Sequence, residues 1–147
     1  MGCERAASVT EKLFASIVNG SRRPRMPNSV YVCGPMSGIE DFNHPAFHAK
    51  ALELRAAGEE VINPAEFDAE IGPDQSWDTY LRRDLVLLAE KCDKVVLLPG
   101  WEDSKGAQLE RYVAEKLGMT IVYPDGLTTR REPAGAANLA AHREVFA

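Results

Sequence analysis

The sequence of 147 residues has no long apolar run and no excess of basic residues, and it contains only three cysteines. All its apolar runs fall well short of the roughly 18 residues that suggest a membrane-spanning helix, so we expect no membrane partner. The N-terminus lacks the apolar segment of a secretory signal peptide. It begins Met-Gly, but Ala6 stands where a myristoylation signal needs Ser or Thr. These absences predict a cytoplasmic protein.

The few metal-binding and redox-active residues are not spaced for a metal or a disulfide. Cys3, Cys33 and Cys92 are odd in number and have no Cys-x-x-Cys spacing, which predicts reduced thiols. His44 and His48 are four residues apart, but no third ligand lies nearby, so we expect neither a metal nor another cofactor. The net charge of −5 disfavours a nucleic-acid polymer as partner. A small anion remains compatible, because helix N-termini bind phosphate without net positive charge.

Short strands and longer helices alternate through the middle of the chain. The predicted strands span 30–33, 60–62, 94–98 and 120–123, and the predicted helices span 43–57, 77–91 and 104–118. Asn43, Ser76 and Ser104 are the expected N-caps. This alternation predicts an α/β fold of the flavodoxin or Rossmann type, with a doubly wound parallel sheet of four to five strands and flanking helices.

The chain ends fall outside this regular pattern. Residues 1–29 contain a linker-like stretch of Gly, Pro, Ser and Arg, which predicts an N-terminal extension. The α/β domain is expected to span 30–126. Residues 127–147 are predicted to be a C-terminal extension with one helix around 134–144.

Glu110 is the leading candidate for a catalytic group. Its neighbours on the predicted helix are all small or apolar: Gly106, Ala107, Val113, Ala114 and Leu117. A carboxylate on this packed face loses its hydration, a cost that suggests a use. The helix also follows a strand, at the end of the sheet where α/β proteins bind ligands.

Asp84 is the second acidic candidate. Its helical neighbours are again mostly apolar: Tyr80, Leu81, Leu87 and Leu88. An Asp in these surroundings is either paired internally or lines a pocket. Arg82 and Arg83 are expected to point away, because adjacent helical residues do not face each other.

Two predicted loops follow strands and offer groups to a ligand. The first is 31-YVCGPMSG-38, where Gly34 and Gly38 allow close backbone approach and Ser37 offers a hydroxyl. A plain turn explains it equally well. The second is 99-PGWEDSKG-106, where Ser104 and the free N–H groups after it form an anion site. Trp101 either stacks on a planar base or covers the core.

An inward Glu and an inward Asp near a helix N-terminus are typical of glycosyl transfer. One carboxylate attacks an anomeric carbon, while the second acid assists the leaving group or orients the sugar. A protease is not indicated, since no histidine has a spacing to Cys or Ser that suggests a nucleophile and its base.

Three ordered segments resemble the nucleoside 2-deoxyribosyltransferase superfamily, in particular its DUF4406 branch: YVCGPMSG, YLRRDLVLL and CDKVVLLPGWEDSKGAQLERYVAEKLG. The resemblance covers about residues 30–123. It implies that Glu110, in the segment Gly-x3-Glu, is the nucleophile and that Asp84 contacts the sugar or base. It also implies that Tyr31 and Gly34 line the pocket and that the protein is a homodimer.

The position six residues before Glu110 bears on the substrate. Superfamily members that use free nucleosides usually carry an acid there, whereas this chain has Ser104. The nucleoside-monophosphate N-glycosidases are similar to this chain in their YxCG turn and in a serine at that position, which binds the 5′-phosphate. A serine suits a phosphate that a carboxylate would repel. The arginine of that branch's first turn is replaced here by Ser37.

The sequence therefore predicts an N-glycosidase that hydrolyses the base–sugar bond of a (2′-deoxy)nucleoside 5′-monophosphate through Glu110, with Asp84 assisting. The predicted substrate-binding residues are Tyr31, Gly34, Ser37, Gly38, Trp101, Ser104 and Gly106. Two alternatives stay open, a base-exchanging nucleoside 2-deoxyribosyltransferase and a non-catalytic nucleotide-binding module. A further alternative is a scaffold that binds partners through 1–29 and 127–147.

Overall fold

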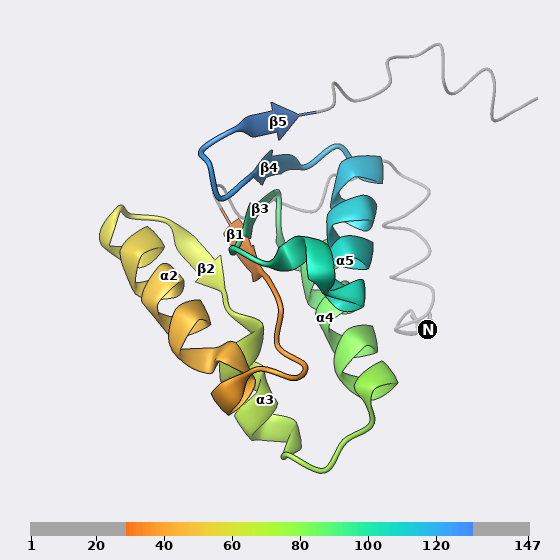
Figure 1. The fold of residues 1–147 in the computed structure, drawn as a ribbon. Coiled ribbons are helices and arrows are strands. Elements are labelled where there is room, and N and C mark those ends of the chain that lie inside the picture. Colours follow the sequence, from red (N-terminus) through yellow and green to blue (C-terminus); the bar gives the residue numbers. More distant parts are fainter. Residues whose placement is uncertain (1–28, 131–147) are drawn as a thin grey trace, which may run out of the picture.

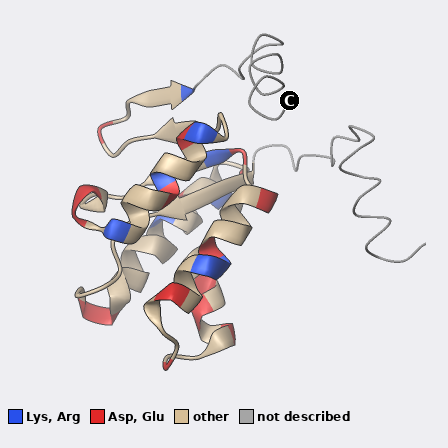
Figure 2. Ribbon diagram, turned by 90° about the vertical axis from the view of Figure 1, so that its right-hand side faces the viewer, with Lys and Arg blue, Asp and Glu red and all other residues tan. Residues whose placement is uncertain are grey.

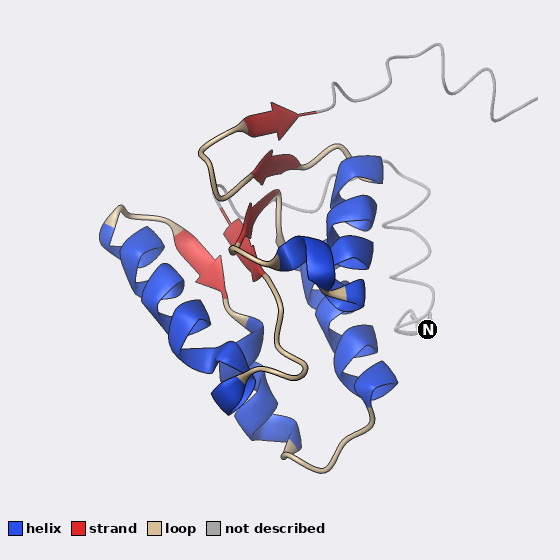
Figure 3. Cartoon of the chain, viewed as in Figure 1, coloured by secondary structure: helices blue, strands red, loops and turns tan. Residues whose placement is uncertain are grey.

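The computed structural model describes residues 29–130, which form a five-stranded sheet flanked by helices (Figure 1, Figure 3). The strand order is β2-β1-β3-β4-β5. The first four strands pair in parallel and β5 pairs antiparallel to β4. The strands are β1 (Ser29–Cys33), β2 (Glu60–Ile62), β3 (Lys94–Leu97), β4 (Thr120–Val122) and β5 (Thr128–Arg130). The predicted α/β class, Rossmann-like with a mostly parallel sheet, is confirmed.

Four α-helices and two short 3-10 turns connect the strands of the described region. They are η1 (Glu40–Asn43), α2 (His44–Ala56), α3 (Pro64–Ile71), α4 (Trp77–Lys91), η2 (Trp101–Asp103) and α5 (Lys105–Lys116). Within residues 29–130, no helix has both the length and the apolar character that a bilayer crossing requires. Figure 2 shows Lys and Arg interspersed with Asp and Glu along the helices of the face in view.

The sheet separates two apolar clusters, and β1 supplies side chains to both. Tyr31 and Cys33 pack with residues of α4 and α5, whereas Val32 packs with residues of α2 and α3. This follows from the strand period of two, which sends successive side chains to opposite faces. Because β1 lies between β2 and β3, the connections diverge from it, and a crevice opens beyond the carboxyl ends of β1 and β3.

The sequence prediction missed two elements. Helix α3 has only eight residues, although Asn63 caps it by accepting a hydrogen bond from the Ala65 N–H and Pro64 opens its first turn. Strand β5 is short and fully exposed, so it carries no hydrophobic pattern. It lies in the segment predicted as the C-terminal extension. The predicted helix around 134–144 and residues 1–28 lie outside the described part of the chain.

The predicted helix starts are confirmed, but only one is capped by its predicted side chain. Ser104 Oγ accepts a hydrogen bond of 3.2 Å from the Ala107 N–H. Ser76 occupies the N-cap position of α4 without such a bond. Asn43 precedes α2 with a φ of 59°, and its Nδ2 donates instead to the Pro35 carbonyl at 2.9 Å. Asn43 thus ties the start of α2 to the loop after β1.

Candidate functional site

A cavity of about 650 Å³ lies in the crevice beyond β1 and β3. Helices α2 and α3 supply one wall, and α4 and α5 supply the other. The volume is in the range of small-molecule sites. Six of the predicted site residues line it: Gly34, Ser37, Asp84, Ser104, Gly106 and Glu110. The fold therefore brings together residues that are up to 76 positions apart in sequence, from Gly34 to Glu110.

Glu110 is buried at the wall of this cavity, with 6% of its surface exposed. Its packed-face position is as the helical period predicted. The Tyr31 hydroxyl donates to Oε1 at 2.9 Å, and the Cys33 thiol donates to Oε2 at 3.0 Å. Both donors come from the face of β1 that packs on α5. Two neutral donors thus hold the carboxylate in place.

The burial of Glu110 changes its acidity. Loss of hydration, and next the charge of Asp84, raise the pKa of Glu110 to about 7, against the hydrogen bonds from Cys33 and Tyr31. Burial and the nearby Glu110 also raise the pKa of Tyr31 and of Cys33 well above their ordinary values. Tyr31 and Cys33 therefore keep their protons at neutral pH and remain donors.

Asp84 is the other buried acid of the cavity, and it is paired internally. Arg83 Nε donates to Asp84 Oδ1 at 2.9 Å, so the prediction that Arg83 points away was wrong. The long arginine side chain curls back along the helix surface, which spacing of Cβ atoms alone does not reveal. Arg82 does point away, and 83% of its side chain is exposed. Burial raises the pKa of Asp84 to about 6, while Arg83 opposes that rise.

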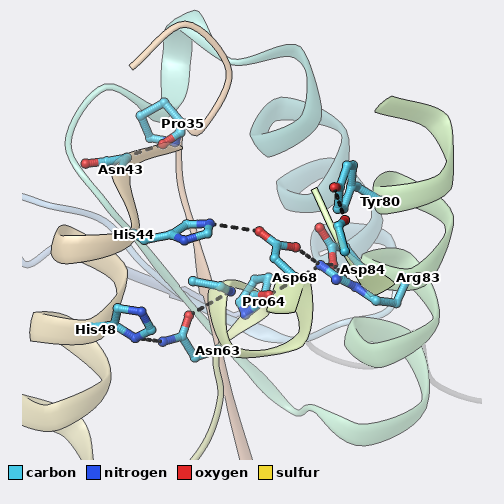
Figure 4. Close-up of polar contacts among 12 residues, drawn as sticks. Pro35, Asn43, His44, His48, Asn63, Pro64, Asp68, Tyr80, Arg83 and Asp84 are labelled. Atoms are coloured by element: carbon cyan, nitrogen blue, oxygen red, sulfur yellow. Dashed lines mark hydrogen bonds and ion pairs between the residues drawn. The ribbon is translucent and has the colours of Figure 1, made fainter. Parts of the chain in front are cut away.

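Arg83 extends the pairing across the cavity wall (Figure 4). Its NH2 group lies 2.7 Å from Asp68 Oδ1 on α3 and donates to the Pro64 carbonyl at 3.3 Å. Asp68 Oδ2 lies 2.9 Å from Nε2 of His44 on α2. A continuous series of polar contacts therefore joins α2, α3 and α4 and ends at Asp84.

Asp68, His44 and His48 also line the cavity, although none of them is among the predicted site residues. Asp68 belongs to the short helix that was missed. The spacing of His44 and His48 alone, without a third ligand, is only weak evidence for a metal site. His48 Nδ1 is 3.2 Å from Asn63 Nδ2. The sequence signal for the two histidines is their spacing of four residues, which places both on one face of a helix.

Three predicted site residues do not line the cavity. Tyr31 is fully buried behind Glu110, where it acts through its hydroxyl. Gly38 is exposed outside the cavity. Trp101 packs edge-on against Tyr123, with 5.8 Å between ring centroids, and Arg111 lies over its ring. The structure therefore supports the interpretation of Trp101 as a cover for the core.

Gly34 and the first turn of α5 both line the cavity. A Cβ on Gly34 would lie 2.8 Å from the Leu98 Cβ, so packing of the two strand ends requires the glycine. Ser104 Oγ caps α5, and Gly106 lies in the first turn, whose N–H groups have no acceptor within the helix. Ser37 lies at the exposed edge of the same region. These groups form a surface suited to an anion.

The fold and site define an α/β protein with two buried carboxylates at the switch point of a mostly parallel sheet. Residues 28–123 match the family model described as Domain of unknown function (DUF4406), and the chain belongs to this family. The match contains every residue that lines the cavity. Searches of curated proteins and of solved structures found no match.

The pairing of Arg83 predicts a stability difference between adjacent arginines. Arg83→Leu leaves Asp68 and Asp84 without their shared cation in a half-buried site, so it should lower the free energy of unfolding by about 2 kcal/mol or more. Arg82→Leu should change it by less than about 0.5 kcal/mol, because Arg82 is exposed. Urea denaturation of both variants measures the difference. Equal losses in the two variants would contradict the pairing.

The raised pKa of Glu110 predicts a pH-dependent stability change. Its pKa is about 7 in the folded chain against 4.5 for an unperturbed Glu, so the unfolded chain releases the proton first and stability falls as pH rises through this window. Glu110→Gln removes the proton release and should be more stable than the wild type by on the order of 2 kcal/mol at pH 8. The gain should vanish near pH 4. Melting curves across this range test it, with the exposed Glu90→Gln as control.

Proposed function

We propose that this chain is an N-glycosidase that hydrolyses the base–sugar bond of a (2′-deoxy)nucleoside 5′-monophosphate. The observation that carries the proposal is the pair of buried carboxylates, Glu110 and Asp84, at the wall of one cavity. Burying two acids at one cavity is costly, and it is typical of sites that use them. The resemblance to the nucleoside 2-deoxyribosyltransferase superfamily supports assigning the nucleophile to Glu110.

In the first step an oxygen of Glu110 attacks C1′ of the sugar. The C1′–N bond breaks, its electron pair passes to the base nitrogen, and the base takes up a proton from solvent water as it leaves. The product is a glycosyl ester on Glu110. In the second step water attacks C1′, gives up a proton to solvent, releases the Glu110 carboxylate and gives the free sugar phosphate. The hydrogen bonds from Tyr31 and Cys33 keep the carboxylate aimed at the cavity through both steps.

Asp84 is assigned to the sugar or to the departing base. Both of its contacts with Arg83 are to Oδ1, so Oδ2 is the oxygen that we assign to the ligand. With pKa values of about 6 and about 7, Asp84 and Glu110 hold one proton between them near neutrality. Asp84 has the lower pKa and ionises first, and Glu110 becomes an ionised nucleophile as the pH rises through about 7.

The 5′-phosphate is assigned to the surface formed by Ser37, Ser104 and the first turn of α5. The positive end of the α5 dipole and the first-turn N–H groups, which have no acceptor within the helix, favour a dianion at this place. Gly34 and Gly106 have no side chain that would cover this surface, so a phosphate can approach the backbone.

Base exchange differs from hydrolysis only in the second step, where another base replaces water. A non-catalytic nucleotide-binding module would use the same cavity without either step. One experiment separates the three functions.

The protein is incubated with a panel of nucleosides and nucleoside monophosphates, and free base is measured by chromatography. We expect base release from monophosphates, with Glu110→Gln reducing the rate at least about a hundredfold because the nucleophile is lost. Glu115→Gln, on the same helix and outside the cavity, is the matched control. Release only when a second base is present indicates the transferase. Binding without release, unchanged in Glu110→Gln, contradicts catalysis.

The pH dependence of base release provides an independent check. Only ionised Glu110 attacks C1′, so kcat/KM should rise with pH through an apparent pKa of about 7. Asp84→Asn removes the neighbouring charge that helps raise this pKa, so the rise should move to lower pH, whatever happens to the maximal rate. A pH–rate profile of both proteins tests the coupling. A rise that stays in place or moves to higher pH would show that Asp84 does not act on Glu110.

A further inference from the structure

The cavity carries two aromatic side chains at its mouth. Phe42 is 59% exposed and Trp77 is 53% exposed, and both line the cavity. A single exposed apolar residue is ordinary on a protein surface. Two aromatic rings on the rim of one cavity are different, because together they offer flat apolar faces to a ligand.

The backbone that carries Phe42 is held in a disfavoured conformation. Asp41, Phe42 and Asn43 have φ values of 51°, 51° and 59°, in the left-handed region that non-glycine residues avoid. The Asn43 side chain anchors this turn to the Pro35 carbonyl. The turn places the Phe42 ring 6.0 Å from the His44 ring, on the cavity wall made by α2. The strained turn thus keeps a large apolar side chain at the cavity instead of in the core.

Trp77 lies on the opposite wall, in line with the buried acid. Trp77, Tyr80 and Asp84 are spaced by three and four residues, so they share one face of α4, and all three line the cavity. Trp77 and Asp84 are seven positions apart, which corresponds to about 10 Å along the helix axis. A base attached to a sugar at Glu110 and Asp84 would extend along this face toward Trp77.

The two aromatic residues reach the cavity from different elements, Phe42 from the turn before α2 and Trp77 from the start of α4. In Figure 1, α2 lies with α3 on one side of the fold and α4 lies with α5 on the other. We propose that Phe42 and Trp77 form the base subsite, in which a planar heteroaromatic ring stacks on Trp77 and contacts Phe42. The sugar end of the ligand then points to Glu110, a placement that rests on the proposed function.

This subsite recognises the presence of a ring more than its identity. Every nucleobase has a π-face, so stacking tolerates a change of base. Glu110 and Asp84 are buried, whereas Phe42 and Trp77 are more than half exposed, so the apolar rings are set apart from the two acids. Ligands with a base should therefore bind more tightly than the sugar phosphate alone, across purines and pyrimidines.

Tryptophan fluorescence tests the subsite directly, because the chain has only Trp77 and Trp101. The Glu110→Gln variant is titrated with dAMP, dCMP and 2-deoxyribose 5-phosphate, so that no turnover occurs. We expect dAMP and dCMP to change the emission and the sugar phosphate to leave it unchanged. Adding Trp77→Phe should abolish the change, since Trp101 is packed outside the cavity.

The role of Phe42 is tested by calorimetric binding of dAMP to the same variant. Phe42→Leu keeps an apolar side chain but loses the ring, and it should weaken binding at least about fivefold. Phe42→Tyr keeps the ring and should restore binding. Tyr112→Leu, which changes an aromatic residue with 51% exposure outside the cavity, is the matched control and should have no effect.

The proposal is overturned if neither mononucleotide binds, or if both bind without a change in Trp77 emission. An equal response to 2-deoxyribose 5-phosphate also overturns it. These results are separate from those for catalysis. If dAMP alters Trp77 emission but the wild type releases no base, the ring subsite stands and the glycosidase assignment fails. If the wild type releases base while Trp77 emission stays constant and Phe42→Leu binds normally, the glycosidase assignment stands and the ring subsite fails.

Discussion

The hydrogen bonds from β1 to the Glu110 carboxylate are the constraint on which the site depends. They require Tyr31 and Cys33 to lie on the face of the sheet that packs against α5, and so fix which residues of β1 face the other way. They also require α5 to start close to the end of β3, where Ser104 caps it. The donors are neutral, so they orient the carboxylate without cancelling the cost of its burial.

The two acids of the cavity meet the same cost in different ways. Asp84 has a cation, Arg83, which it shares with Asp68 on a neighbouring helix. Burial raises the pKa of both acids, but the opposing charge of Arg83 contributes to the lower value of Asp84, about 6 against about 7 for Glu110. The shared arginine also joins α4 to α3 and, through Asp68 and His44, to α2 (Figure 4). The polar contacts of Arg83 therefore do two things. They join the helices of the cavity wall, and they place a positive charge beside Asp84.

The sequence predicted best what depends on periodicity. The buried face of Glu110 follows from residues three and four positions away, and the α/β class follows from the alternation of strands and helices. It failed where contacts join distant segments or where elements are short. Helix α3 has two turns, β5 is exposed throughout, and the curl of Arg83 onto Asp84 depends on Asp68 from that missed helix. Tyr31 was placed in the pocket, but strand alternation alone does not say what lies between it and the ligand.

In the proposed reaction, the burial of Glu110 has a chemical consequence. A carboxylate that attacks C1′ becomes a neutral ester, so the lost hydration that raises its pKa no longer penalises it in the intermediate. Asp84, which retains an ion pair with Arg83, keeps its charge available for a hydroxyl or a leaving base. The cavity thus combines two different acids. Glu110 is stabilised when it becomes a neutral ester, and Asp84 is stabilised while it is charged. In the proposed reaction, that difference, set by two protonated donors on one side and one arginine on the other, gives the two carboxylates separate roles.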